Sequence, residues 1–295
     1  MKIRLISGSC YVAILVAFYL MKIFIHDLCF DALLYFCSLV GAFEMLRATK
    51  EKTTKPQRVV CFAFATLCIP ACALCQQFFG NGMQIVALCL FFAVLATLAL
   101  LVADHENTSL ESIGVSLLSL VYPTLFLSVL VIANHANAPQ GLENFAFNSD
   151  LLVLFIFVIS PFADSFAYLF GRFLRKYFPR PFAPTISPNK TAVGAIGGLV
   201  GGLIGATVLY FSYNAVVGSF ENMALWLPVY LLVGLLSAGA TELGDLFESA
   251  IKRKVEIKDM GKIMPGHGGV LDRIDGTMFA TILVYATYIV VQWIA

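Results

Sequence analysis

Long apolar stretches alternate with short polar segments along this chain of 295 residues. A helix that crosses a bilayer needs about 20 predominantly apolar residues. Nine runs meet that length, allowing for some tilt, and they lie near 5–25, 28–46, 59–79, 83–103, 113–133, 151–171, 192–213, 226–247 and 276–294. The pattern predicts an all-α, polytopic integral membrane protein with about nine transmembrane helices.

The composition supports a membrane protein and argues against a nucleic-acid-binding protein. Hydrophobic residues make up 60% of the chain and charged residues only 13%, far from the balance of a soluble domain. The net charge is +1, and no run of lysine and arginine is interleaved with stacking aromatics. We therefore expect membrane lipid as a partner, and no nucleic acid.

The positive charges fall in alternate loops. With a cytoplasmic N-terminus, every lysine and arginine except Lys22 lies in or beside a cytoplasmic loop. Membrane proteins typically carry an excess of lysine and arginine in their cytoplasmic loops, so this asymmetry supports that orientation. It predicts an N-terminal region, 1–150, with about five spans. It also predicts a C-terminal region, 151–295, with about four spans and two polar cytoplasmic loops, 172–191 and 248–275.

The sixth span carries polar residues on one face. Asp164, Tyr168 and Arg172 are spaced at i, i+4 and i+8, which brings them to the same side of a helix. An ionisable residue inside a span is costly and is a functional candidate by default. The alternative is an Asp164–Arg172 network that only anchors the end of the helix.

A second concentration of charge surrounds the last loop. Glu242, Asp245 and Ser249 lie toward the end of the eighth span, and Asp272 and Asp275 share a face at the start of the ninth. Carboxylates gathered at neighbouring helix ends repel one another unless cations lie between them. Either a divalent metal or a salt-bridged lid of lysine and arginine satisfies that requirement.

Two segments resemble the bacterial-type phosphatidate cytidylyltransferases (CDP-diacylglycerol synthases). The stronger match is a family signature read here as Ser249-x-x-Lys252-Arg253, Lys258-Asp259 and Pro265-x-His267-Gly268-Gly269-x-x-Asp272-Arg273-x-Asp275. The weaker match is Ser187-Pro188-Asn189-Lys190-Thr191, in which Asn189 replaces a lysine of the family pattern. The resemblance is confined chiefly to 160–275, apart from an isolated Glu44.

This resemblance implies a nucleotidyltransferase of phospholipid biosynthesis. The enzyme would transfer CMP from CTP to phosphatidate, giving CDP-diacylglycerol and pyrophosphate. It would be a multi-pass protein of the cell (inner) membrane with its active site on the cytoplasmic side. The resemblance also implies a homodimer and Mg²⁺ as cofactor, with a second cation left open.

The family's functional residues carry over position by position. The catalytic set would be Asp245, Asp272, Lys258, Asp259 and His267. The metal ligands would be Asp245 and Asp272, with Asp275 and Asp164 as second choices. Substrate would contact Asp164, Tyr168, Arg172, Ser187, Lys190, Thr191, Ser249, Lys252, Arg253, Gly268, Gly269 and Arg273. We expect His267 to bind a phosphate or hold the glycine turn, because the attacking phosphate monoester, with a second pKa of about 6, needs no base.

Three other functions remain as alternatives. A CTP-dependent lipid kinase would use a similar cluster but would need a base for the lipid hydroxyl. A secondary transporter would carry its essential charges near the middle of the membrane. The charged residues singled out here lie instead near the cytoplasmic boundary of the membrane. A purely structural scaffold gives no reason for the spacing of the signature.

Overall fold

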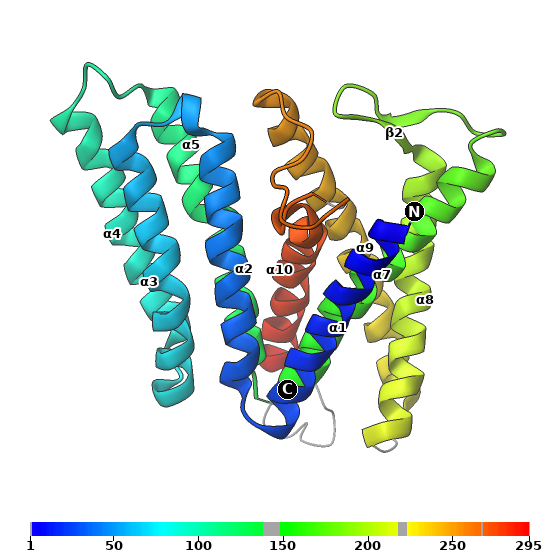
Figure 1. Cartoon of the computed structure of the whole chain (residues 1–295). Helices are drawn as coiled ribbons and strands as arrows, with labels where there is room; N and C mark the ends of the chain where they lie inside the picture. Colours follow the sequence, from blue (N-terminus) through cyan, green and yellow to red (C-terminus); the bar gives the residue numbers. More distant parts are fainter. Residues whose placement is uncertain (1, 138–147, 218–222, 267, 295) are drawn as a thin grey trace. The chain divides into compact units, whose positions relative to one another are not determined.

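The fold is a set of long helices with one short hairpin (Figure 1). The computed structural model describes residues 2–137, 148–217, 223–266 and 268–294. Within these ranges, nine helical segments are long and apolar enough to cross a membrane, which confirms the predicted number. The chain divides into two compact units, Met1–His135 with Lys254–Ile274, and Ala136–Arg253 with Asp275–Ala295.

The first unit contains the N-terminal helices and the loop that carries most of the signature. Its elements are α1 (Lys2–Phe24), α2 (Asp27–Ala48), the 3-10 turn η1 (Lys50–Lys52), α3 (Lys55–Phe79), α4 (Gly82–Ala103), α5 (Leu110–Leu120), the π turn η2 (Val121–Leu125) and α6 (Phe126–Asn134). The fifth span, Leu110–Asn134, is formed by α5, η2 and α6 together.

Buried polar contacts join the helices of the first unit. Asp31 of α2 accepts a hydrogen bond from the Asn134 amide at 2.9 Å, and its other oxygen lies 2.6 Å from His135 Nε2. Gln57 of α3 donates to the Ser112 hydroxyl of α5 at 2.9 Å. Polar groups withdrawn from water need such partners, so these pairs favour one arrangement of the helices.

The second unit contains the remaining helices and the hairpin. Its elements are α7 (Ser149–Leu174), β1 (Pro181–Ala183), β2 (Ser187–Thr191), α8 (Ala192–Val217) and α9 (Met223–Lys254). The two strands pair antiparallel, with Pro181 opposite Thr191 and Ala183 opposite Ser187. The last helix, α10 (Leu271–Ile294), begins in the segment assigned to the first unit and continues in the second.

Glycines allow α8 to pack closely on both of its neighbours. A methyl group on Gly201 would lie 2.6 Å from the carbonyl oxygen of Phe162 in α7, and one on Gly205 would lie 3.1 Å from the Phe162 side chain. On another face, a methyl group on Gly202 would collide with Ala238 of α9 and lie 2.6 Å from the Gly234 carbonyl. Small residues permit this close approach between membrane helices.

Two helices extend beyond their apolar runs. The predicted eighth span ends near 247, but α9 continues to Lys254, so Ser249, Lys252 and Arg253 are helical. The predicted ninth span begins near 276, but α10 begins at Leu271 and includes Asp272 and Asp275. The irregular part of the predicted loop 248–275 is therefore only 255–270.

The packing of α8 predicts different outcomes for the same substitution at two glycines. Gly201→Ala places a methyl group against the backbone of α7 and should cost about 1–3 kcal/mol of stability through overpacking. Gly114→Ala in α5 meets nothing within 4 Å and should be neutral or stabilising by up to about 1 kcal/mol. Thermal unfolding in detergent measures both, and equal midpoints for the two variants would contradict the packing.

Candidate functional site

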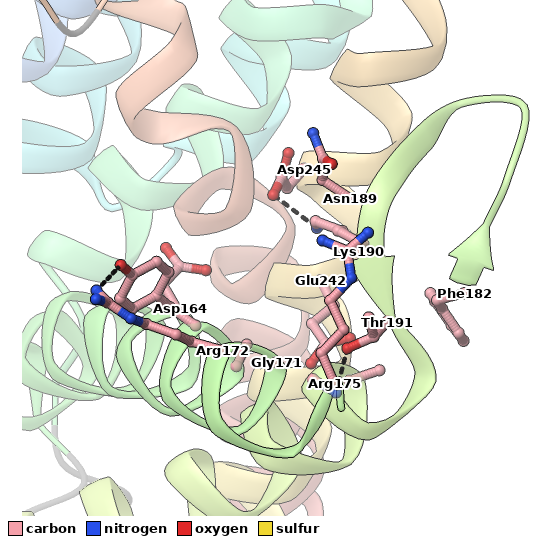
Figure 2. A pocket seen from close by; sticks show the side chains of 14 residues that line it. Asp164, Gly171, Arg172, Arg175, Phe182, Asn189, Lys190, Thr191, Glu242 and Asp245 are labelled. Carbon is pink, nitrogen blue, oxygen red and sulfur yellow. Dashed lines mark hydrogen bonds and ion pairs between the residues drawn. The ribbon is translucent and has the colours of Figure 1, made fainter. Parts of the chain in front are cut away.

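A pocket of about 670 Å³ opens in the second unit, between α7, the hairpin, α8 and α9 (Figure 2). Its charged lining comprises three cations and three carboxylates: Arg172, Arg175, Lys190, Asp164, Glu242 and Asp245. Tyr168 and Phe182 add aromatic surface, and Asn189 adds a neutral amide. The pocket therefore combines groups that bind phosphate with groups that bind cations.

The predicted polar face of α7 contributes one wall. Arg172 donates a hydrogen bond from Nη1 to the Tyr168 hydroxyl at 2.8 Å, and its guanidinium carbon lies 5.9 Å from the centre of that ring. Asp164 lies two turns earlier on the same wall (Figure 2). The i, i+4, i+8 spacing thus brings these three side chains to one cavity, as the sequence predicts.

The hairpin brings Lys190 to the opposite side of the pocket. Lys190 Nζ lies 2.6 Å from Asp245 Oδ2 of α9 (Figure 2). Thr191 follows at the end of β2, where its hydroxyl accepts a hydrogen bond from the Gly194 N–H at 3.1 Å. Thr191 is buried and occupies the N-cap position of α8, so its first role is to fix the strand-to-helix junction.

Carboxylates from three helices gather around this ion pair. Asp275 of α10 interacts electrostatically with Asp245 and Asp164, and also with Lys252. The backbones of α9 and α10 approach closely here, since a methyl group on Gly244 would lie 2.5 Å from the Asp275 carbonyl oxygen. Asp275 does not line the pocket itself, but its charge acts on the carboxylates that do.

Glu242 is a lining residue that the predicted site set omits. Its Oε1 atom is buried and has no hydrogen-bond partner among the described residues. It lies against Gly198 of α8, where any side chain would collide with the carboxylate. Glu242 precedes Asp245 by one turn, and that spacing is the signal by which the sequence could have assigned it. Arg175, one turn after Arg172, is the other charged lining residue outside the predicted set.

The signature residues in the last turns of α9 do not line the pocket, and one of them contacts the hairpin. Ser249 lies 3.4 Å from Asp245 Oδ1, and Lys252 pairs with the buried Glu248 at 3.0 Å. Arg253 donates to the Ile186 carbonyl at 3.2 Å, at the turn between β1 and β2. Ser187, the remaining residue predicted on the hairpin, also lies outside the pocket lining.

The other half of the signature is folded in the first unit. Asp272 is buried, and its Oδ2 accepts hydrogen bonds from the backbone N–H groups of Met260 at 2.9 Å and Gly269 at 2.8 Å. Gly268 has a φ of +89°, and a methyl group there would lie 2.7 Å from the same oxygen. Gly268 is thus required by the turn that Asp272 holds.

Three further charged residues of the signature are exposed. Lys258, Asp259 and Arg273 present their side chains to the surface of this unit. His267, predicted to bind phosphate or hold the turn, lies outside the described residues.

The proposed metal ligands divide between the two units. Asp245 and Asp275 belong to the second unit and Asp272 to the first. A metal site shared by Asp245 and Asp272 therefore stays a prediction. Among the described residues, no group of three or more His, Cys, Asp and Glu side chains is arranged to hold a metal ion. The second unit nevertheless supplies the oxygen ligands that Mg²⁺ prefers, together with the unpartnered Glu242 oxygen.

Comparison with known proteins gives consistent results. The model of the cytidylyltransferase family matches residues 2–291. The phosphatidate cytidylyltransferase of Bacillus subtilis (strain 168) is 29% identical over 290 residues, which cover 97% of this chain and 96% of that protein. The protein of the same name from Staphylococcus saprophyticus is 42% identical over 127 residues, 43% of this chain.

The staphylococcal matches are higher in identity but shorter. They span less than half of the relative: 45% of the Staphylococcus saprophyticus protein, and 45% of the Staphylococcus aureus (strain COL) protein at 43% identity. The family match, by contrast, extends over nearly all of the sequence and includes both the pocket and the signature loop. This chain belongs to the cytidylyltransferase family, as the resemblance of its signature predicted.

Proposed function

We propose that this protein is a phosphatidate cytidylyltransferase, which converts CTP and phosphatidate to CDP-diacylglycerol and pyrophosphate. The observation that carries the proposal is the pocket in which Arg172, Arg175 and Lys190 face carboxylates at the end of membrane helices. The family membership and the names of the relatives support it.

The reaction joins two anionic substrates, phosphatidate and CTP. A phosphate oxygen of phosphatidate attacks the α-phosphorus of CTP, a new P–O bond forms, and the bond to pyrophosphate breaks. The attacking phosphate has a second pKa of about 6 and is already ionised near neutral pH. The protein therefore has little need of a general base, and electrostatic stabilisation is its main contribution.

The cations of the site would provide that stabilisation. Arg172 can hold a phosphate in two-point contact, and its bond to the Tyr168 hydroxyl orients the guanidinium. Lys190 would compensate charge close to Asp245, with which it is paired. We assign Lys258 and Arg273 of the first unit, and the flanking Asp259 and His267, to the same reaction on the strength of the family signature alone.

The carboxylates of the site would bind Mg²⁺. The residues that would hold it are Asp245 and Asp275, with Asp272 as the ligand implied by the signature. When bound, a divalent cation would neutralise charge on the nucleotide phosphates. The excess of carboxylates near Asp275 and the unpartnered Glu242 oxygen support this assignment.

We further propose that the protein lies in the cell membrane with its N-terminus and active site in the cytoplasm, and that it is a homodimer. CTP arrives from water while phosphatidate keeps its acyl chains in lipid, so the site must meet both phases. The distribution of lysine and arginine supports this orientation. Labelling of a cysteine introduced into a loop with a membrane-impermeant reagent, read in sealed vesicles, distinguishes the two orientations.

The position of an isotopic label tests the reaction. Purified protein with phosphatidate and Mg²⁺ should transfer the label of α-³²P-CTP to lipid and release the label of γ-³²P-CTP as pyrophosphate. A lipid kinase would do the reverse, giving γ-labelled lipid and CDP. γ-Labelled lipid, or transport of lipid without turnover of CTP, would overturn the proposal.

Substitution of the carboxylates tests the site. Asp245→Asn and Asp272→Asn should each lower kcat at least about 100-fold, in the range found when one transition-state contact is removed. Both proteins should insert into membranes like the wild type.

The matched control is Asp104→Asn. Asp104 is exposed and accepts a hydrogen bond from Asn107, so its substitution should leave turnover within about 2-fold of the wild type. Lys50→Gln, in an exposed pair with Glu51, should be equally silent. Substantial residual activity in Asp272→Asn would count against Asp272 as a ligand.

A further inference from the structure

A carboxylate of the second helix holds the start of the last one. Glu44 is only 1% exposed and lies near the end of α2. Its Oε2 accepts a hydrogen bond from the Leu271 N–H at 2.9 Å, and its Oε1 accepts one from the Val270 N–H at 3.3 Å. The first N–H groups of a helix have no acceptor within the helix, so Glu44 caps α10 from a different element.

The charge of Glu44 suits this position. The N-terminus of a helix carries a partial positive charge, and a carboxylate there is stabilised by it. Hydrogen bonds to an ionised acceptor are also stronger than those between neutral groups. Glu44 also interacts electrostatically with Asp272, a like charge, and with Arg47, an opposite one.

Arg47 contacts the loop at a second point, within its first half. It follows Glu44 by one turn, and its Nη2 donates to the Met260 carbonyl at 2.9 Å. The N–H of the same residue, Met260, is bound by Asp272. Both backbone polar groups of Met260 are therefore fixed, directly after the exposed pair Lys258-Asp259.

Glycines of the loop leave room for the carboxylate. A side chain on Gly261 or on Gly269 would collide with Glu44. Gly269 is the second glycine of the signature, and its own N–H is bound by Asp272. Its lack of a side chain thus allows the loop to lie directly on Glu44, in addition to any contact with substrate.

We propose that Glu44 and Arg47 are positioning residues for the signature loop, 255–270. They act through backbone groups at two points: Arg47 through Met260 within the loop, and Glu44 through Val270 and Leu271 where the loop meets α10. In this way they determine where Lys258, Asp259 and Asp272 are presented. The effect on turnover rests on the proposed function, whereas the effect on the loop does not.

Hydrogen–deuterium exchange measures the loop without any substrate. In Glu44→Gln, one of the two acceptor oxygens is replaced by an NH2 donor, so either the Val270 or the Leu271 N–H loses its acceptor. Peptides that contain Val270 and Leu271 should therefore exchange about tenfold faster or more. Peptides from α3 and α4 should keep the exchange of the wild type. Unchanged exchange in the loop would overturn the proposal.

Turnover is the second measurement. Glu44→Gln should lower kcat by about 10- to 100-fold, while the KM for CTP changes by less than about 3-fold, because the loop is displaced and the pocket of the second unit is untouched. Glu44→Asp keeps the charge and should recover part of the loss. Glu51→Gln, the same change at an exposed residue, should have no effect.

Arg47 keeps the proposal testable if Glu44→Gln fails to fold. Arg47 is exposed, so Arg47→Gln should fold, exchange faster around Met260 and lose about tenfold in kcat. Arg47→Lys keeps a donor and should remain closer to the wild type. A folded Arg47→Gln with normal exchange and turnover would overturn the proposal.

The two proposals fail separately. A wild-type protein that makes no CDP-diacylglycerol would refute the proposed function, whereas the exchange result for the loop would still stand. If the wild type is active, and Glu44→Gln and Arg47→Gln both keep its loop exchange and its turnover, the positioning role alone is refuted.

Discussion

Backbone amides that have no partner in regular structure are the constraint on which the signature loop depends. The loop 255–270 contains one isolated bridge, between Met264 and Gly268, and is otherwise irregular. Two buried carboxylates, Glu44 and Asp272, accept four backbone N–H groups: one within the loop, at Met260, and three where the loop meets α10, at Gly269, Val270 and Leu271. Unsatisfied polar groups in an apolar setting cost several kcal/mol each, so these carboxylates define the conformation of the loop. Asp272 therefore has a structural role whether or not it also binds a metal.

The sequence predicted the spans well and the helix ends poorly, for one physical reason. Hydropathy marks where a chain leaves the hydrocarbon, whereas a helix ends where its hydrogen bonds are interrupted. Beyond its apolar run, α9 continues for about two turns with Ser249, Lys252 and Arg253. These polar residues are compatible with a helix in water, and nothing in the pattern breaks it before Lys254. The start of α10 at Leu271 reflects the same difference.

Local spacing explains which parts of the site could be predicted. Asp164, Tyr168 and Arg172 lie on one helix, so periodicity alone brought them to one face, and the pocket has them together. Lys190 could be proposed only from the family pattern, because its partner Asp245 is on another element. Glu44 and Leu271 are separated by 227 positions, and no periodicity connects residues so distant. Such contacts appear only once the chain is folded.

The balance of charge in the pocket bears on how an anionic nucleotide could bind. Three cations and three carboxylates line the cavity, so its formal charge is zero, and Asp275 nearby adds a further negative charge. A neutral or negative cavity has no net attraction for a triphosphate. A divalent cation bound by the carboxylates would turn that balance positive and leave Arg172 and Arg175 available for phosphate. If the proposed function holds, the lining that holds Lys190 against Asp245 would favour binding of the nucleotide together with a divalent cation over binding of the nucleotide alone.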